Sequence, residues 1–300
     1  MTQSASTAEE LLTPYADVVT SARSPWAESW RRLRKHRLAV VSLGYLVVVL
    51  FVAVFAPLIT SATYSAIGFT PLAPASLHHI MGTDELGRDM WSRVAYGARI
   101  SLIVGFGSQA IALAIGLPLG AIAGFYGRAA DTVLMRATDI MFALPSILVA
   151  LLFVTAFGTT VGVLTFAIGF ATWPTLARLV RAEVLRTKQL DFIEAAESIG
   201  CTRARILRVH VLPHAMGPVI VQVTFGISQA IFTEAFLSFI GLGAQPPAPS
   251  WGRLLVDGFQ YIRTSPHLVI YPGLALFLTI LALNTLGDGL RDAFDPQEDD

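Results

Sequence analysis

Residues Leu38 to Ile59 read LAVVSLGYLVVVLFVAVFAPLI, and this stretch decides the kind of fold. Its 22 residues include no Asp, Glu, Lys or Arg. At a rise of about 1.5 Å per residue they would form a helix about 33 Å long, which is enough to cross the hydrocarbon core of a bilayer. The stretch therefore predicts a transmembrane helix.

The composition of the whole chain points the same way. Of its 300 residues 54% are apolar and only 14% are charged, against about 25% charged residues in soluble domains. The formal net charge is zero, which argues against a nucleic-acid partner. Cys201 is the only cysteine, so neither an intrachain disulfide nor a multi-cysteine zinc site can form.

Further uncharged stretches predict five more spans. They run from Ile100 to Phe125, from Ile140 to Ala177 and from Thr264 to Gly287, and the apolar segment 211–240 has one charged residue, Glu234. The stretch that begins at Ile140 is too long for one helix, and turn residues between 157 and 162 divide it in two. The sequence thus predicts an all-α polytopic membrane protein with six transmembrane helices, at residues 38–59, 100–125, 140–157, 161–178, 211–240 and 269–287.

The distribution of basic residues predicts the orientation of these spans. Arg and Lys gather at residues 23–37 and again at 178–208, so by the positive-inside rule both regions lie in the cytoplasm. The segments 61–98 and 241–263 then face outward, and both termini lie inside. A cleaved signal peptide is an alternative for the first span, but an apolar core of 22 residues exceeds the usual length of about 7–15.

The expected organisation has three parts. Residues 1–37 form a cytoplasmic N-terminal segment, disordered up to about residue 24 and then basic. Residues 38–290 form the six-helix membrane domain, which includes a cytoplasmic loop at 181–213. Residues 291–300 form an acidic C-terminal tail.

The cytoplasmic loop contains the stretch DFIEAAESIGCTRARILRVHVLP, residues 191–213. Asp191 can cap a short helix, with Glu194 reaching back in a variant of the capping box, and Gly200 can end that helix. Thr202 can cap a second helix that runs to residue 212, and Pro213 suits the first turn of the next span. The sequence therefore predicts two short helices about a glycine turn.

Two other interpretations of this loop were open from the residues alone. Two helices about a turn, the second bearing arginines, also describe a DNA-binding helix-turn-helix, but a loop held at both ends by membrane helices can hardly enter a major groove. The other interpretation is a connector without a partner, in which Ala195 and Ala196 are simply good helix formers.

The pattern Glu194-Ala195-Ala196, Gly200 and Leu212-Pro213 is similar to the EAA loop of permease subunits of bacterial ABC importers. Where the general pattern has Ile, this chain has His210, which fits the peptide-type branch. Three more segments resemble the C-type permease of dipeptide, oligopeptide and nickel importers: GTDELGRD at 82–89, LSFIGLGAQPPAPSWG at 237–252 and NTLGDGLRD at 284–292. The resemblance covers about residues 30 to 296.

The resemblance implies a type I ABC importer permease fold in a bacterial cytoplasmic (inner) membrane. It also implies a second homologous permease subunit, two cytoplasmic ATPase subunits and an extracytoplasmic substrate-binding protein as partners, besides the lipid bilayer. The cargo stays open between a dipeptide, an oligopeptide, a nickel complex and glutathione. The residues implied to couple the permease to its ATPases are Asp191, Glu194, Ala195, Ala196, Gly200, Ile206, His210, Leu212 and Pro213.

Two polar residues inside the spans are candidates for the pathway or a gate. They are Glu234 and Asn284, since an ionisable group within a span usually faces protein or water. A structural role for Glu234, bonded to the outward loop, is an equally open alternative. The cluster from Asp84 to Asp89 predicts an amphipathic helix at the outer surface, capped by Asp84 and with its charges solvated.

The residues give no support for catalysis, a cofactor or a metal. The only lysines, Lys35 and Lys188, follow Arg34 and Thr187, so the Gly-Lys-[Ser/Thr] of an ATPase phosphate loop is absent from the sequence. His210 and His214 are four residues apart but lack a third ligand. A membrane enzyme would need a catalytic constellation within the spans, and an ion-driven transporter would need more carboxylates there than Glu234. We therefore expect energy to come from other polypeptides.

Overall fold

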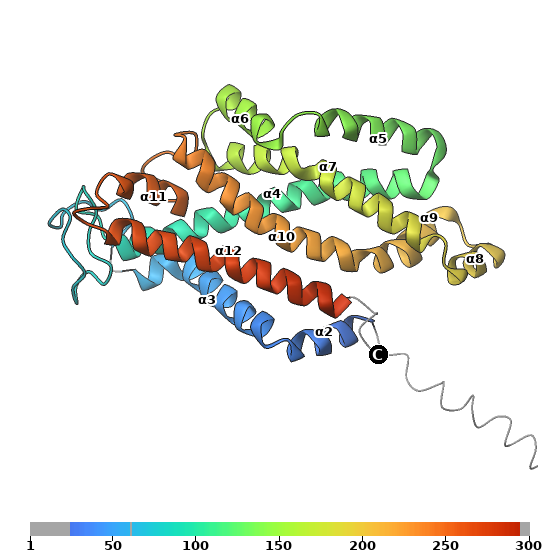
Figure 1. Cartoon of the computed structure of the whole chain (residues 1–300), viewed down its shortest axis with the longest axis horizontal. Coiled ribbons are helices and arrows are strands. Elements are labelled where there is room, and N and C mark those ends of the chain that lie inside the picture. The colour runs from blue at the N-terminus through green and yellow to red at the C-terminus, as the bar shows by residue number, and fades with distance from the viewer. Residues whose placement is uncertain (1–24, 61, 295–300) are drawn as a thin grey trace, which may run out of the picture.

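The computed structural model describes residues 25–60 and 62–294, and its helices run alongside one another in an elongated bundle (Figure 1). The segment 1–24, for which disorder is expected, lies outside these residues. The helices are α2 Pro25–Lys35, α3 Arg37–Ile59, α4 Met90–Tyr126, α5 Arg128–Phe142, α6 Ser146–Phe157, α7 Val161–Thr187, α8 Asp191–Ser198, α9 Arg203–Arg205, the π-helix η2 Ile206–Val211, α10 Leu212–Phe239, α11 Trp251–Phe259 and α12 His267–Phe294. The described chain is thus all-helical, as the sequence predicts.

Five helical stretches are long and apolar enough to cross a membrane. They are α3, α4, α7, the continuous stretch Arg203–Phe239, and α12. The bent pair α5 and α6 would count as a sixth span if the two helices are taken together. The total of five to six agrees with the number of spans expected.

The third expected span, 140–157, differs most from the structure. Its residues belong to α5 and α6, which are bent by 78° relative to each other. Pro145 lies at the bend, directly before α6. Proline disfavours a helical conformation of the residue before it, so the chain does not continue from α5 to α6 as one straight helix. With 12 residues α6 is about 18 Å long, too short to cross a bilayer alone.

Other helices extend beyond their expected ends. The second span begins at Met90 rather than at residue 100, and the fourth, α7, continues to Thr187 rather than stopping at 178. The fifth begins as far back as Arg203, and α12 runs on to Phe294, into the expected tail. The expected spans ended where charges begin, whereas these helices continue through charged turns that pack against protein.

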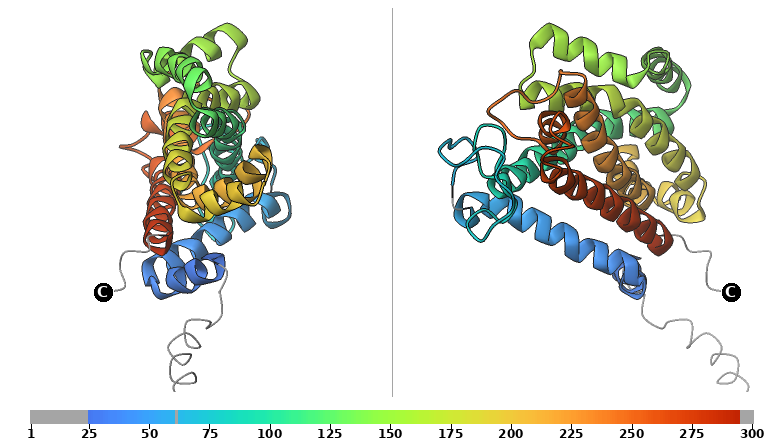
Figure 2. Two further views of the ribbon diagram at one scale, coloured as in Figure 1. Left: turned by 90° about the vertical axis from the view of Figure 1, so that its right-hand side faces the viewer. Right: turned by 60° about the vertical axis from the view of Figure 1, so that its left-hand side comes forward.

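α4 and α7 lie against each other over most of their length and form the centre of the bundle (Figure 2). A row of glycines on α4 permits this approach. A methyl group on Gly116 would lie 2.8 Å from the carbonyl oxygen of Trp173, and one on Gly124 would lie 2.8 Å from that of Arg181. Between them, Gly120 faces Ala177 in the same way. Small residues four apart let two membrane helices come into backbone contact.

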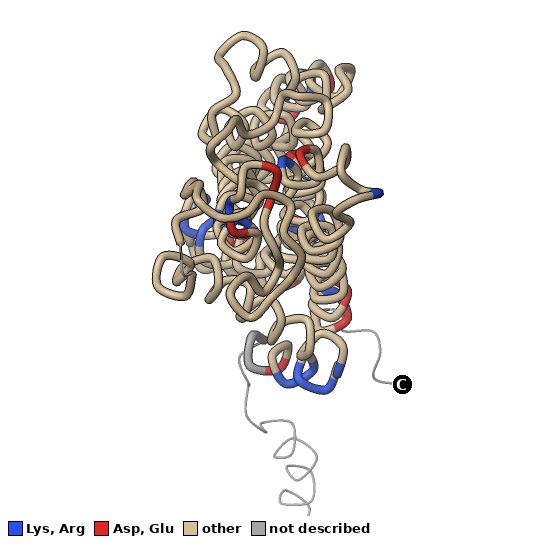
Figure 3. Tube along the Cα trace, turned by 90° about the vertical axis from the view of Figure 1, so that its left-hand side faces the viewer, with Lys and Arg blue, Asp and Glu red and all other residues tan. Residues whose placement is uncertain are grey.

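α2 lies across the end of α3, and its basic residues form a band there (Figure 3). Leu33 is the buried anchor of α2 and packs against Ala39 and Ala293. His36 then caps α3, because its Nδ1 accepts a hydrogen bond from the backbone N–H of Ala39 at 3.2 Å. The expected basic segment before the first span is therefore a helix attached to the bundle.

At the opposite end of the bundle, the loop 62–89 and α11 cover the ends of α3, α4 and α12 (Figure 1). Trp251 of α11 is buried there, and its Nε1 donates to the carbonyl oxygen of Val94 at 3.0 Å. The expected surface helix capped by Asp84 is wrong. Asp89 caps α4 instead, since its Oδ2 accepts from the Ser92 N–H at 2.8 Å.

Asp84 is buried rather than solvated. It accepts hydrogen bonds from the backbone N–H and the Nε of Arg88, at 2.8 and 2.6 Å, and it pairs with Arg93. Arg93 is also buried, and its Nη2 lies 3.4 Å from an Asp257 carboxylate oxygen on α11. This charge cluster joins the loop 62–89, α4 and α11. The expectation that these charges are solvated is wrong, because opposite charges from separate elements pair with one another there.

Candidate functional site

The first candidate site is the loop between α7 and α10, which projects at one end of the bundle (Figure 1). α8 begins at Asp191, and its N-cap is Leu190, which makes no side-chain capping bond. The expected cap at Asp191 is therefore wrong by one position. Asp191 and Glu194 both lie in the first turn of α8, where negative charge is favourable to the helix dipole.

The glycine turn lies where the sequence places it. Gly200 has φ of +81°, a conformation that residues with a side chain rarely adopt. The N–H of Gly200 donates to Glu197 O at 3.0 Å, and the N–H of Cys201 donates to Ala196 O at 3.1 Å. This pair of bonds is the Schellman motif that ends a helix.

The second expected helix is present but is not separate from the fifth span. α9, η2 and α10 form one continuous stretch from Arg203 to Phe239. Within it the N–H of Leu212 donates to the carbonyl oxygen of Leu207, five residues back. Pro213 follows directly, and its ring would clash with the carbonyl oxygen four residues earlier in a regular α-helix. The wider π-helical turn before it makes room for the ring. The expected helix from 202 to 212 therefore becomes the first part of a long helix.

One face of α8 is fixed against the bundle. Ile193 and Ala196 are buried in a cluster that includes Val184 of α7 and Ile206 and Val211 of the following helix. The loop is further attached by Lys188, whose Nζ donates to the carbonyl oxygen of Phe125 in the last turn of α4 at 2.9 Å. The loop is thus a packed extension of the membrane helices.

A neighbouring side of α8, about a quarter turn from the buried one, is exposed and apolar. Phe192, Ala195 and Ile199 are spaced three and four residues apart, so they share one side of the helix, and all three are exposed. Ile199 is 80% exposed, and with its two neighbours it makes a small apolar patch. We call these three residues the docking face. Glu194 is also exposed, on a different side of the helix.

The remaining residues predicted for this loop lie behind or beside the docking face. Ile206 is buried, Leu212 and His210 are partly buried, and Pro213 and Gly200 are exposed. The backbone oxygen of His210 bonds with the ring Nδ1 of His214 at 2.8 Å. The ring of His214 also packs on that of Phe192, with centroids 4.7 Å apart. His214 therefore packs α10 against α8, while its bond to His210 stays within the long helix.

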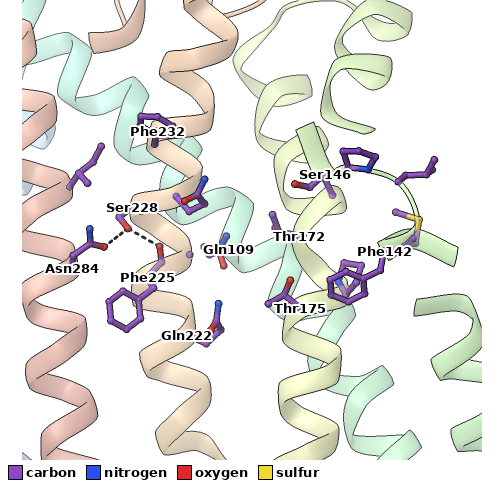
Figure 4. Close-up of a pocket in the computed structure, with 18 residues that line it drawn as sticks. Gln109, Phe142, Ser146, Thr172, Thr175, Gln222, Phe225, Ser228, Phe232 and Asn284 are labelled. Atoms are coloured by element: carbon purple, nitrogen blue, oxygen red, sulfur yellow. Dashed lines mark hydrogen bonds between the residues drawn. The ribbon is translucent and has the colours of Figure 1, made fainter. Parts of the chain in front are cut away.

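The second candidate site is a cavity of about 870 Å³ between α4, α7, α10, α12 and the bend that joins α5 to α6 (Figure 4). None of the described residues that line it is an Asp, Glu, Lys, Arg or His. Its polar lining consists of amides and hydroxyls, which can donate and accept hydrogen bonds without a fixed charge. These residues are Gln109, Ser146, Thr172, Thr175, Gln222, Ser228, Gln229 and Asn284.

Asn284 lies in this cavity, whereas Glu234 does not. The Oγ of Ser228 is 2.7 Å from the Asn284 Oδ1, a hydrogen bond that links α10 to α12 at the cavity wall (Figure 4). Gln109 reaches in from α4 because Gly226 leaves room for it: a methyl group on Gly226 would overlap the Gln109 amide.

Glu234 is fully buried in α10, on the side of the segment that leads into α11. Its Oε1 accepts hydrogen bonds from the hydroxyls of Ser250 and Ser238, at 2.7 and 2.8 Å. Ser250 is the N-cap of α11. The geometry therefore supports the structural alternative that the sequence left open, since Glu234 bonds α10 to the segment 241–263.

Most of the cavity residues were missed by sequence reasoning. One weak signal was available, since Gln222 and Gln229 are seven residues apart in an apolar helix and so share a face. Thr172 and Ser146 gave no such signal, because single hydroxyl residues are common in membrane helices.

Comparisons with known proteins place this architecture in a family. Residues 116–299 match the family described as binding-protein-dependent transport system inner membrane component. Residues 24–74 match the family described as the N-terminal TM domain of oligopeptide transport permease C.

Two relatives are similar over almost the whole chain. A dipeptide transport system permease protein DppC from Alkalihalophilus pseudofirmus is 43% identical over 278 residues, which are 92% of this chain and 91% of the relative. A glutathione transport system permease protein GsiD from Pectobacterium atrosepticum is 40% identical over 280 residues, 92% of this chain and 93% of the relative.

Solved structures agree on the fold. A chain of the MetNI methionine ABC transporter in inward-facing conformations has a TM-score of 0.55 at 19% identity, over 69% of this chain and 98% of that chain. A chain of an amino acid ABC transporter with histidines has a TM-score of 0.53 at 17% identity, over 67% of this chain and 93% of that one.

Proposed function

Because this chain belongs to the family of binding-protein-dependent transport system inner membrane components, we propose that it forms a peptide translocation pathway together with a second permease subunit. The chain is a multi-pass inner-membrane permease subunit of an ABC importer. In our proposal two separate ATPase subunits and an extracytoplasmic binding protein complete the importer. Both termini and the loop that bears α8 lie in the cytoplasm.

The docking face of α8 is the observation that carries this proposal. A large apolar side chain such as Ile199, held out on a loop that is itself packed on the bundle, needs a protein partner to leave water. The first turn of α8 also carries the acidic residues Asp191 and Glu194. We propose that a groove on each cytoplasmic ATPase receives this face, and that closure of the ATPase pair moves α8 and the long helix after it as one body.

The uncharged cavity supports the peptide assignment. A peptide carries amide donors and acceptors along its backbone, and the amides and hydroxyls of this cavity can pair with them in turn. A volume of about 870 Å³ lies within the usual range of small-molecule sites, about 300–1,000 Å³. The dipeptide and glutathione named for the two relatives fit this description.

The coupling part of the proposal can be tested with Ile199→Glu. Burying an isoleucine contributes about 1.5–3 kcal/mol, so a charge in its place should lower co-purification of the ATPase subunits about tenfold or more. Leu77→Glu is the matched control, since Leu77 is 99% exposed in the loop at the other end of the bundle. If Ile199→Glu retains its ATPases as fully as Leu77→Glu does, α8 is not the docking element.

The cargo can be tested separately in inverted or reconstituted vesicles that contain the binding protein. ATP-dependent uptake of a labelled dipeptide, a longer peptide, glutathione and a nickel chelate would be compared. We expect the peptides or glutathione to be taken up. Uptake of the nickel chelate alone would contradict the peptide assignment.

A further inference from the structure

A second hollow lies on the outer flank of the bundle, where α3 crosses α4. It has a volume of about 380 Å³. Its walls are apolar side chains that include Leu50 and Val54 of α3 and Ile103 and Phe106 of α4, each about half exposed. The single charged residue in its lining is Arg99, whose side chain is also exposed.

Arg99 lies beside α3 at a level before the last turns of that helix. The residues beside it in the hollow, Leu50 and Val54, precede the last residue of α3, Ile59, by nine and five positions. At about 1.5 Å per residue, this places the hollow about 8–14 Å before the end of the apolar helix. Since α3 is only long enough to cross the hydrocarbon core, Arg99 begins within the hydrocarbon layer of the leaflet on the Ile59 side.

An arginine at that depth needs a partner of opposite charge. Within residues 25–60 and 62–294 the guanidinium of Arg99 has no hydrogen bond or ion pair. Arg93, one and a half turns earlier on α4, is by contrast paired with Asp84 and Asp257. Only 17% of the apolar window of α3 is buried inside the chain, the smallest share of the five spans, so this flank faces what surrounds the subunit.

We propose that the hollow between α3 and α4 binds one phospholipid of the leaflet on the Ile59 side. The lipid phosphate binds the guanidinium of Arg99, whose planar fork of donors matches phosphate oxygens. The long arginine side chain reaches from the hydrocarbon toward the headgroups. One acyl chain of the same lipid lies in the groove against Leu50, Val54 and Phe106. The charge and the apolar walls thus fit the two ends of one molecule.

The test uses the intact transporter, purified with the subunits that accompany this chain and stripped of loosely bound lipid. Phosphatidylglycerol is added, and native mass spectrometry counts the lipids retained. We expect Arg99→Gln to lower the affinity of the most strongly retained lipid about tenfold. Arg99→Lys should keep most of it, because it keeps the charge. Arg136→Gln, which removes an exposed arginine of α5, is the matched control and should change nothing.

A second variant separates the groove from the charge. Ile103→Trp fills the hollow without altering any charge, and it should also release the lipid. Inorganic phosphate, which has no acyl chain, should not displace the lipid. Equal lipid retention by Arg99→Gln and by the unaltered transporter would overturn the proposal. So would loss of the second permease subunit from Arg99→Gln with lipid retention unchanged, because Arg99 would then pair with a carboxylate of that subunit.

Discussion

Two buried carboxylates hold together the end of this permease subunit that is formed by the loop 62–89 and α11. Glu234 joins α10 to the N-cap of α11, and Asp84 joins the loop 62–89 to α4. Each accepts hydrogen bonds from residues distant in the sequence or from another element. A buried polar group stabilises a fold only while its partners are present, so substitution of either residue should destabilise the subunit.

Glu234→Ala should destabilise the subunit by about 2–3 kcal/mol, because it leaves the hydroxyls of Ser238 and Ser250 without their acceptor. Glu234→Gln keeps an oxygen acceptor in the same place and should cost less than half as much. Thermal unfolding in detergent would measure both. Equal loss in the two variants would show that the negative charge, rather than the acceptor, is what matters.

Asp84→Asn removes the negative charge between two buried arginines. Breaking one partner of a buried ion pair costs about 3–5 kcal/mol, and Arg88 and Arg93 would both lose a charged acceptor. The matched control is Asp139→Asn, whose pair with Arg178 is about half exposed and should contribute about 0–1 kcal/mol. The same unfolding measurement would compare the two variants. Similar melting points would contradict the claim that the buried pairs of Asp84 stabilise the subunit more than the exposed pair of Asp139 does.

At the scale of elements, close helix contacts and one glycine turn shape the molecule. The glycine row of α4 brings α7 into backbone contact, and α7 leads directly into the loop that carries α8. The turn at Gly200 then directs the chain back into the long helix that contains α10. The docking face is therefore rigidly connected to helices that line the cavity, which is what transmission of movement requires.

Gly200→Val should disturb this connection. The left-handed conformation at φ of +81° costs a residue with a side chain about 1–2 kcal/mol, although nothing lies within 4 Å of the position a Cβ would take. We expect reduced ATPase co-purification and reduced substrate-stimulated ATPase activity, with normal membrane insertion.

Gly158→Val is the control for this substitution. Gly158 has φ of +93° and equally open surroundings, but it lies in the turn between α6 and α7. Gly158→Val imposes at least as much backbone strain, because φ of +93° with ψ of 175° is a region that almost only glycine adopts. A loss of coupling confined to Gly200→Val therefore reports the role of the loop. Equal coupling in both variants would mean that the turn at Gly200 is not needed for docking. Glu194→Lys, which puts a positive charge in the first turn of α8, should act in the same direction as Gly200→Val.

At the scale of the whole molecule, the segments that connect the long helices gather at the two ends of the bundle. α2 and the loop with α8 lie at one end, and the loop 62–89 with α11 lies at the other (Figure 1). The proposed orientation puts the first end in the cytoplasm, because the cytoplasmic segments of membrane proteins carry an excess of Lys and Arg.

Cysteine labelling tests that orientation. In a background with Cys201→Ser, single cysteines at Ser76 and Gln245, both exposed at the outward end, should react with a membrane-impermeant thiol reagent in spheroplasts. A cysteine at Arg186, also exposed, should react only after the membrane is permeabilised. The reverse pattern would invert the proposed topology.

The sequence by itself determined the class of protein and the local form of the loop. Uncharged runs such as Leu38–Ile59 are informative because a bilayer sets a fixed length for any span. The stop of α8 at Gly200 could be predicted because it depends on one residue and its immediate neighbours. The exact cap, at Leu190, could not, because helix ends shift by a residue with the packing around them.

Only the tertiary structure decided which residues meet. The bend at Pro145, the burial of Asp84 with Arg93, and the place of Arg99 beside α3 each depend on helices far apart in the sequence. The cavity is the clearest case, since its polar residues come from separate helices and each looks ordinary in its own segment. Periodicity shows that a helix has faces, but packing against the other helices decides what each face touches.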